Sequence, residues 1–161
     1  MNTIEYRAIG LIRTPFIKAD GTPIQPTAQG AAEAVVEVFP EYSQGLADLD
    51  GFSHIILLYH LHKSRQHSLT VKPFLDDKTH GLFATRAPSR PNAIGLSVVC
   101  LIKIEGNKLY IKEADMLDGT PLLDIKPYVP EFDVREVQKT GWLADASGKL
   151  EKTKDDGRFS R

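Results

Sequence analysis

The sequence predicts a mainly β protein, a single-domain antiparallel β-barrel with few short helices. Three observations predict this class. Apolar segments rich in β-branched and aromatic residues recur along the chain, Pro- and Gly-containing turns separate them, and helices long enough to connect parallel strands are missing from the pattern. Such a chain favours an antiparallel sheet that closes on itself. We expect the barrel domain over residues 1–140, and a polar tail over 141–161 that is a loose appendage with at most one short helix.

The elements expected in the first half are a strand over 5–12, a turn-rich stretch over 18–30, a strand over 34–39, a short helix within 40–49 and a central strand over 52–62. The first strand alternates polar and apolar residues, and the second is β-branched and stops at Pro40. The third is a long apolar run with aromatic and β-branched residues, which indicates a central strand. The turn-rich stretch holds too many prolines for a helix.

The elements expected in the second half are strands over 69–75, 96–105 and 108–115, followed by a turn at Asp118-Gly119 and an extended segment through Tyr128. Gly106-Asn107 has the chemistry of a tight hairpin between two of these strands. In the extended segment Asp124, Lys126 and Tyr128 alternate with apolar residues and therefore share one side. This arrangement is explained either by an edge strand with a salt bridge or by a rim that presents polar groups to a ligand.

Composition narrows the class of protein. At 161 residues with 42% hydrophobic residues, the chain is long enough for one soluble domain with its own core, and no apolar run reaches the length of a membrane span. The single cysteine, Cys100, lies in an apolar run where we expect a buried strand position, and it fits a reducing cytoplasm. A net charge of −1 does not indicate a nucleic-acid binder, so such a role would need a local basic patch.

The most informative segment is the proline-rich loop 83–97, FATRAPSRPNAIGLS. Its two prolines, Pro88 and Pro91, exclude a helix, so the loop is expected to be stiff and extended until it enters a strand. Arg86 and Arg90 on a stiff loop suit a polar or anionic ligand, because little ordering entropy is lost on binding. The same composition also describes a surface turn with solvated charges.

Histidines gather in the middle of the chain and raise the question of a metal. All five fall between residues 54 and 80, and His60 and His62 would share one face of a strand. No cysteine or acidic residue joins them at the spacing of a zinc site, so we expect no metal.

Three blocks of sequence together carry a family resemblance. DLDGFSHIILLYHLHKS, FATRAPSRPNAIGLS and DMLDGTPLLDIKPYVPEFD, in this order, closely resemble the TsaA-like (TrmO) family over roughly residues 5–135. The resemblance implies a β-barrel that binds S-adenosylmethionine and methylates N6 of threonylcarbamoyladenosine at position 37 of certain tRNAs. The absence of a Gly-rich strand-to-helix loop, which a Rossmann methyltransferase would need, agrees with it.

The resemblance also implies a cofactor site in this sequence. The matching positions are Pro23, Ile24, Gln25, His62, Lys63, Arg86, Leu96, Asp118, Pro121, Leu122, Leu123 and Asp124. Ile24 departs from the family, whose members often carry arginine there. Arg86 or Lys63 suits the carboxylate of S-adenosylmethionine, the three leucines suit the adenine, and Asp118 or Asp124 suits its ammonium or a ribose hydroxyl.

Catalysis and partners follow as expectations from the same resemblance. The carbamoylated nitrogen is a poor nucleophile, so we expect Asp124, with Tyr128, to act as base or hydrogen-bond acceptor. Contacts to tRNA are expected from Arg65, Lys72, Arg90 and Asn92. The family implies a cytoplasmic homodimer with the cofactor near the subunit boundary. Two alternatives remain open, namely a methyltransferase of the same barrel for a small molecule and a non-catalytic S-adenosylmethionine sensor.

Overall fold

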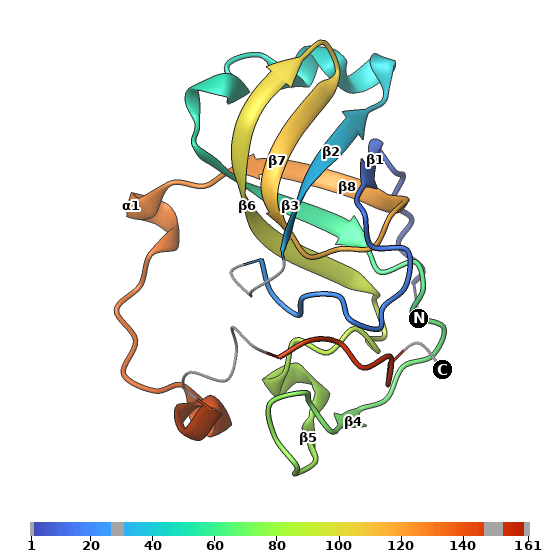
Figure 1. Cartoon of the computed structure of the whole chain (residues 1–161), viewed down its shortest axis with the longest axis vertical. Coiled ribbons are helices and arrows are strands. Elements are labelled where there is room, and N and C mark those ends of the chain that lie inside the picture. The colour runs from blue at the N-terminus through green and yellow to red at the C-terminus, as the bar shows by residue number, and fades with distance from the viewer. Residues whose placement is uncertain (1, 27–30, 147–152, 160–161) are drawn as a thin grey trace.

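The computed structural model describes residues 2–26, 31–146 and 153–159. The end of the expected turn-rich stretch (27–30) and parts of the expected tail (147–152 and 160–161) lie outside the described residues. A barrel forms one end of the molecule, and a smaller lobe built from loops lies beyond it (Figure 1).

Six strands close the barrel in the order β1-β2-β7-β6-β3-β8, and every neighbouring pair is antiparallel. Their bounds are β1 Gly10–Arg13, β2 Ala32–Val38, β3 His54–His60, β6 Ile94–Glu105, β7 Lys108–Ala114 and β8 Thr120–Pro127. The expected fold class is thereby confirmed. The long apolar run is central, as predicted, because β3 pairs with both β6 and β8. The extended segment β8 is not an edge strand, since it pairs with β1 and β3.

The core fills the barrel because side chains alternate along each strand. Ile12, Val36, Leu57, Ile111 and Leu122, from five different strands, are fully buried inside it. Fully burying one such side chain contributes about 1.5–3 kcal/mol, so the closed sheet and its filling stabilise each other. The tight hairpin is also as predicted, because Gly106 takes the left-handed conformation (φ 61°) between β6 and β7.

Several predicted boundaries differ from the structure. The first strand begins only at Gly10, because the side chains of Glu5 and Tyr6 are exposed and have no sheet neighbour. The expected helix within 40–49 is a 3₁₀ helix, η1 (Pro40–Leu46), followed by the short η2 (Leu49–Gly51). In both segments the sequence pattern predicts a regular element, but packing against the rest of the protein decides where that element begins and which type it is.

The lobe, residues 69–90, replaces the long strand expected over 69–75. Only β4 (Thr70–Val71) is a strand, paired with β5 (His80–Gly81), and the 3₁₀ helix η3 (Leu82–Ala84) follows. Pro73, which cannot donate to a ladder, lies just beyond β4. Val71, Leu82 and Ala87 form a small second core. Near the C-terminal end lie α1 (Pro130–Asp133) and the 3₁₀ helix η4 (Gly141–Ala146), which is beside the lobe (Figure 1).

The outer side of β3 and β6 is apolar. This outer apolar face is formed by Ile56, Leu58, Ile94, Leu96 and Val98, whose register pairs Ile56 with Val98 and Leu58 with Leu96. Ile94 and Leu96 are 41% and 51% exposed. The face is thus an apolar surface that the described residues of this chain leave uncovered.

The expectation of a core position for Cys100 is wrong. The side chain is partly exposed on the outer side of β6, opposite His54, because Val99 and Leu101 on either side of it turn into the barrel. Alternation in a strand allows only every second residue into the core, and an unbroken apolar run hides which set that is.

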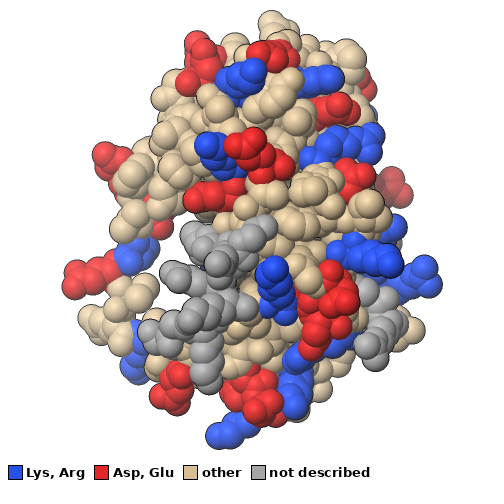
Figure 2. Space-filling model, in the orientation of Figure 1, with Lys and Arg blue, Asp and Glu red and all other residues tan. Residues whose placement is uncertain are grey.

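Charges of both signs lie side by side on the face shown in Figure 2. Ion pairs on the surface of the protein include Arg13–Glu37, Lys112–Glu33 and Lys126–Asp124. Among the described residues, no helix is long and apolar enough to cross a membrane.

We predict that Gly95→Ala destabilises the barrel by about 1–3 kcal/mol, because overpacking forces neighbours out of place. A Cβ on Gly95 would overlap the ring of Tyr59, which lies across it from β3. Gly45→Ala is the matched control, since nothing lies within 4 Å of the added atom. Urea denaturation measures both. Equal stability of the two variants would contradict this packing.

Candidate functional site

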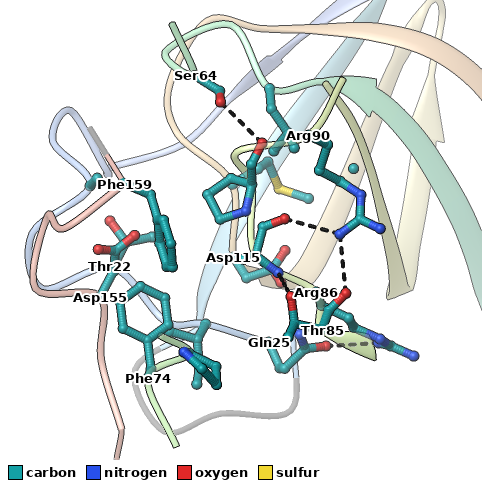
Figure 3. A pocket seen from close by; sticks show the side chains of 18 of the residues that line it. Thr22, Gln25, Ser64, Phe74, Thr85, Arg86, Arg90, Asp115, Asp155 and Phe159 are labelled. Atoms are coloured by element: carbon teal, nitrogen blue, oxygen red, sulfur yellow. Dashed lines mark hydrogen bonds between the residues drawn. The ribbon is translucent and has the colours of Figure 1, made fainter. Parts of the chain in front are cut away.

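One large pocket lies where the open end of the barrel meets the lobe (Figure 3). Its volume is about 1050 Å³. Four parts of the chain line it: the ends of β3 and β6, the connection from β7 to β8, the loop around Thr22–Gln25, and the lobe with residues from the C-terminal end. Pockets for drug-sized ligands span roughly 300–1,000 Å³, so this one has room for a cofactor and part of a second molecule.

A buried hydrogen-bonded chain forms the barrel side of the pocket. The Ser97 hydroxyl donates to Asp115 Oδ1 at 2.7 Å, so the Tyr59 hydroxyl, 2.9 Å from Ser97 Oγ, is the donor to it. Burial raises the pKa of Asp115 to about 6, although the Ser97 hydrogen bond and the Arg86 charge act in the opposite direction. Burial likewise raises the pKa of the Tyr59 phenol, with the charge of Asp115 adding to it. The Asp115 carboxylate therefore lies in a part of the pocket wall that is shielded from water, and the nearby hydrogen bond and positive charge stabilise its ionised form only in part.

Backbone irregularity aims Asp115 at the pocket. The register of β2 and β7 shifts between Ala32 and Ala34, and Glu113 takes a left-handed conformation with φ 68°. A β-bulge re-aims the side chains that follow it. Ala114 is consequently buried in the barrel core, while Asp115, Met116 and Leu117 line the pocket.

The proline loop supplies a stiff wall, as predicted. Arg90 Nη1 donates to the carbonyls of Thr85 and Ala87, each at 3.1 Å, and so braces the loop from within. Arg86 is exposed, and its Nη1 donates to Gln25 Oε1 at 3.0 Å across the mouth of the pocket. The remaining donors of its guanidinium can meet an anion.

His62 and Lys63 follow β3 at the rim. Thr120 Oγ1 donates to the Leu117 carbonyl at 2.7 Å, so the Nδ1 of His62, 3.3 Å away, is the donor toward Thr120. Burial, followed by the charge of Lys63, lowers the pKa of His62. The imidazole is therefore held neutral near pH 7, with Lys63 as the exposed cation beside it.

The structure brings most of the predicted cofactor residues together. Those that line the pocket are Pro23, Ile24, Gln25, His62, Lys63, Arg86 and Leu96. Arg90, predicted to contact tRNA, lines it as well. Those that do not line it in this chain are Asp118, Pro121, Leu122, Leu123, Asp124 and Tyr128.

This second group has other surroundings. Asp118 Oδ1 accepts the backbone N–H of Thr14 at 3.1 Å and thus fixes the segment after β1 against the β7–β8 connection. The Leu122 side chain is fully buried in the barrel core. Asp124 forms an ion pair with Lys126 at 2.7 Å. The predicted tRNA contacts Arg65, Lys72 and Asn92 are all exposed outside the pocket.

Sequence reasoning missed many residues that line the pocket. Five of them are Tyr59, Asp115, Trp142, Asp155 and Phe159. Asp115 lies three residues before Asp118 in a block that was singled out, and an acidic residue at a strand end is a usable signal. The last three fall in the segment expected to be a loose tail, and nothing in their local pattern distinguishes them. Within residues 2–26, 31–146 and 153–159, no group of three His, Cys, Asp or Glu side chains could hold a metal ion.

The pocket belongs to a chain with recognisable relatives. Residues 11–134 match the family described as the tRNA-methyltransferase O N-terminal domain. The chain is a member of this family. The TsaA-like (TrmO) resemblance of the three sequence blocks is thereby confirmed. The C-terminal residues that line the pocket lie beyond the matched range.

Similar proteins agree with this assignment. A probable S-adenosyl-L-methionine-binding protein of Pyrococcus abyssi is 57% identical over 96% of this chain and 84% of its own length. The human tRNA (adenine(37)-N6)-methyltransferase is 39% identical over 78% of this chain, which spans only 30% of the human protein. A crystal structure of TrmO from Pseudomonas aeruginosa superposes with a TM-score of 0.72 at 39% identity, covering 88% of this chain and 63% of that one.

We predict that Asp115→Asn, which removes a charge from the TrmO-type pocket wall, raises the free energy of unfolding at pH 8 by up to about 3 kcal/mol. The folded-state pKa of about 6 lies above the ordinary value of 3.8, so the folded protein binds the proton more tightly. Stability conferred by the protonated carboxyl is therefore lost as pH rises from about 4 to 6. Denaturation across this range measures it, with the exposed Asp145→Asn as control. An unchanged pH slope in the Asp115 variant would contradict the assignment.

Proposed function

We propose that this protein is an S-adenosylmethionine-dependent methyltransferase that modifies N6 of threonylcarbamoyladenosine at position 37 of tRNA. The observation that carries the proposal is the convergence of Pro23–Gln25, His62–Lys63, Arg86 and Leu96, distant in sequence, on one pocket. The names of the human and Pyrococcus relatives support the reaction and the cofactor respectively. Modification of tRNA also fits a cytoplasmic protein.

The residues of the pocket fit the groups that S-adenosylmethionine carries. Arg86 and Lys63 are exposed cations at the mouth and suit its carboxylate, with the arginine fork giving bidentate geometry. Asp115 offers a partly buried carboxylate for an ammonium or a ribose hydroxyl. Leu96, Leu117 and Met116 offer apolar surface for the adenine. When bound, the cofactor supplies an electrophilic methyl group.

The work left to the protein is positioning and control of a proton. Holding two reactants in line can contribute about 7–11 kcal/mol to lowering the barrier. The methylated nitrogen also loses its proton as the new N–C bond forms, and an acceptor must receive it. The stiff proline loop and the buried Tyr59–Ser97–Asp115 chain give the pocket the rigidity that positioning requires.

We propose further that two copies associate through the outer apolar face and that Asp124 and Tyr128 act in the partner's pocket. Register places Asp124, Leu58 and Leu96 in one row across β8, β3 and β6. Leu96 belongs both to this face and to the pocket. A partner packed against the face would therefore bring its own Asp124 and Tyr128 to the pocket mouth.

The function is tested by methyl transfer from radiolabelled S-adenosylmethionine into bulk tRNA with and without the threonylcarbamoyl group. We expect label only in the modified tRNA, and loss of most of it in Arg86→Ala, while the exposed Arg135→Ala, outside the pocket, keeps full activity. Label in neither pool, with cofactor binding seen by calorimetry, would contradict the tRNA substrate. A small molecule or a sensing role would then replace it.

Subunit complementation tests the shared site. We expect Asp124→Asn and Arg86→Ala each to be nearly inactive alone, because one lacks the acceptor and the other the cofactor clamp. Mixed dimers regain activity, since one of their two pockets combines the intact Arg86 of one subunit with the intact Asp124 of the other. Full turnover by Asp124→Asn alone, or a monomer in sedimentation, would contradict the proposal.

A further inference from the structure

The C-terminal segment Thr153–Phe159, here named the closing segment, pairs with the loop that carries the Pro23–Gln25 element. The Gly21 N–H donates to the Asp155 carbonyl at 2.6 Å, and the Asp155 N–H donates to the Thr22 carbonyl at 2.8 Å. Pro23 and Lys154 form an antiparallel bridge beside them. Figure 1 shows the segment running between the barrel and the lobe. The segment is thus attached by backbone hydrogen bonds that any sequence could form.

Its other attachment, to the lobe, depends on side chains. Arg158 Nη1 donates to the carbonyls of Lys72 and Pro73, both at 3.2 Å, and its guanidinium lies 5.0 Å from the centre of the Phe74 ring. Phe159 meets Phe74 edge to face, with ring centres 5.2 Å apart. Phe159 also packs against the second core of the lobe. Aromatic pairs of this kind contribute about 0.5–1.5 kcal/mol beyond their buried area.

The closing segment therefore bridges two opposite walls of the pocket. Asp155 and Phe159 themselves line the cavity, beside Thr22 and Phe74 (Figure 3). The Arg86–Gln25 hydrogen bond joins the same two walls at the mouth, and Arg86 is exposed there. An exposed single hydrogen bond contributes little rigidity, so the closing segment is the stronger of these two links.

We propose that the closing segment is a positioning element of the cofactor site, with Phe159 as its anchor in the lobe. When the segment is docked, it sets the distance between the Thr22–Gln25 loop and Arg86. These are two walls of the pocket between which the cofactor binds in the proposed function, so this inference rests on that function. A site held open at the right width loses less conformational entropy on binding. The segment lies outside residues 11–134, which match the family.

The test is calorimetric titration of S-adenosylhomocysteine into the full chain. We expect Phe159→Ala to raise Kd by about tenfold, because the ring contact with Phe74 and the packing against the second core are lost together. Phe159→Leu restores most of the affinity, since it refills the apolar contact. Phe132→Ala, which removes a ring that is 70% exposed on α1, leaves Kd unchanged.

Two further readouts separate positioning from general destabilisation. With the labelled-tRNA assay, Phe159→Ala raises KM for S-adenosylmethionine while kcat at saturation stays close to that of the unsubstituted protein. Hydrogen exchange of the Gly21 amide, which donates to Asp155, becomes faster in the same variant without ligand. Unchanged Kd and unchanged Gly21 exchange in Phe159→Ala would overturn this inference alone. No binding to the unsubstituted protein would overturn the proposed function as well.

Discussion

The contact between Tyr59 and Gly95 is the constraint on which the site depends. The ring of Tyr59 lies against the bare backbone of Gly95 in the neighbouring strand, and this position brings its hydroxyl to Ser97. Ser97 in turn holds Asp115 on the connection after β7. One glycine thus lets two strands, β3 and β6, and the connection after β7 share a polar chain at the open end of the barrel. Each polar group in this chain has a hydrogen-bond partner, but these partners offset the desolvation of the Asp115 carboxylate only in part, so its pKa stays raised.

The barrel and the lobe contribute different properties to the pocket. The barrel side is buried, closed by sheet hydrogen bonds and carries a carboxylate whose pKa is raised by burial. The lobe side has little regular structure, and its small core of Val71, Leu82 and Ala87 is completed by Phe159 from the far end of the chain. The two sides of the pocket are therefore held by different means, the barrel side by sheet hydrogen bonds and the lobe side by its small core and by the hydrogen bonds of Arg90 within the proline loop.

Much of the fold could be predicted from the sequence because local pattern and tertiary structure agree there. The β6–β7 hairpin follows from Gly106-Asn107, and the central place of β3 follows from its unbroken apolar run. Whether the Cys100 side chain points into the barrel or outward could not be predicted. Consecutive residues around it are apolar, so no alternation of polar and apolar residues indicates which face is the inner one. The first strand was predicted too long because an alternating pattern does not reveal where a pairing partner ends.

Residues of the site could be predicted only where a recognisable stretch of sequence contains them. The family resemblance placed Gln25, His62 and Arg86 at the pocket, whereas the role of Asp115 depends on a bulge and on a serine in another strand. Phe159 reaches the pocket through long-range packing that leaves no local signal. Predicted residues of β8, such as Leu122, are in the barrel because strand register, rather than motif membership, decides which side chains reach a cavity.

A crystal structure of the protein with S-adenosylhomocysteine tests the central claim most directly. The account predicts the ligand between the Pro23–Gln25 loop, Arg86 and the Asp115–Leu117 connection, with its carboxylate at Arg86 or Lys63. It also predicts Phe159 in contact with Phe74, as in the free protein. Ligand bound elsewhere, or bound in this pocket without contact to Arg86, Lys63 and Asp115, would contradict the account.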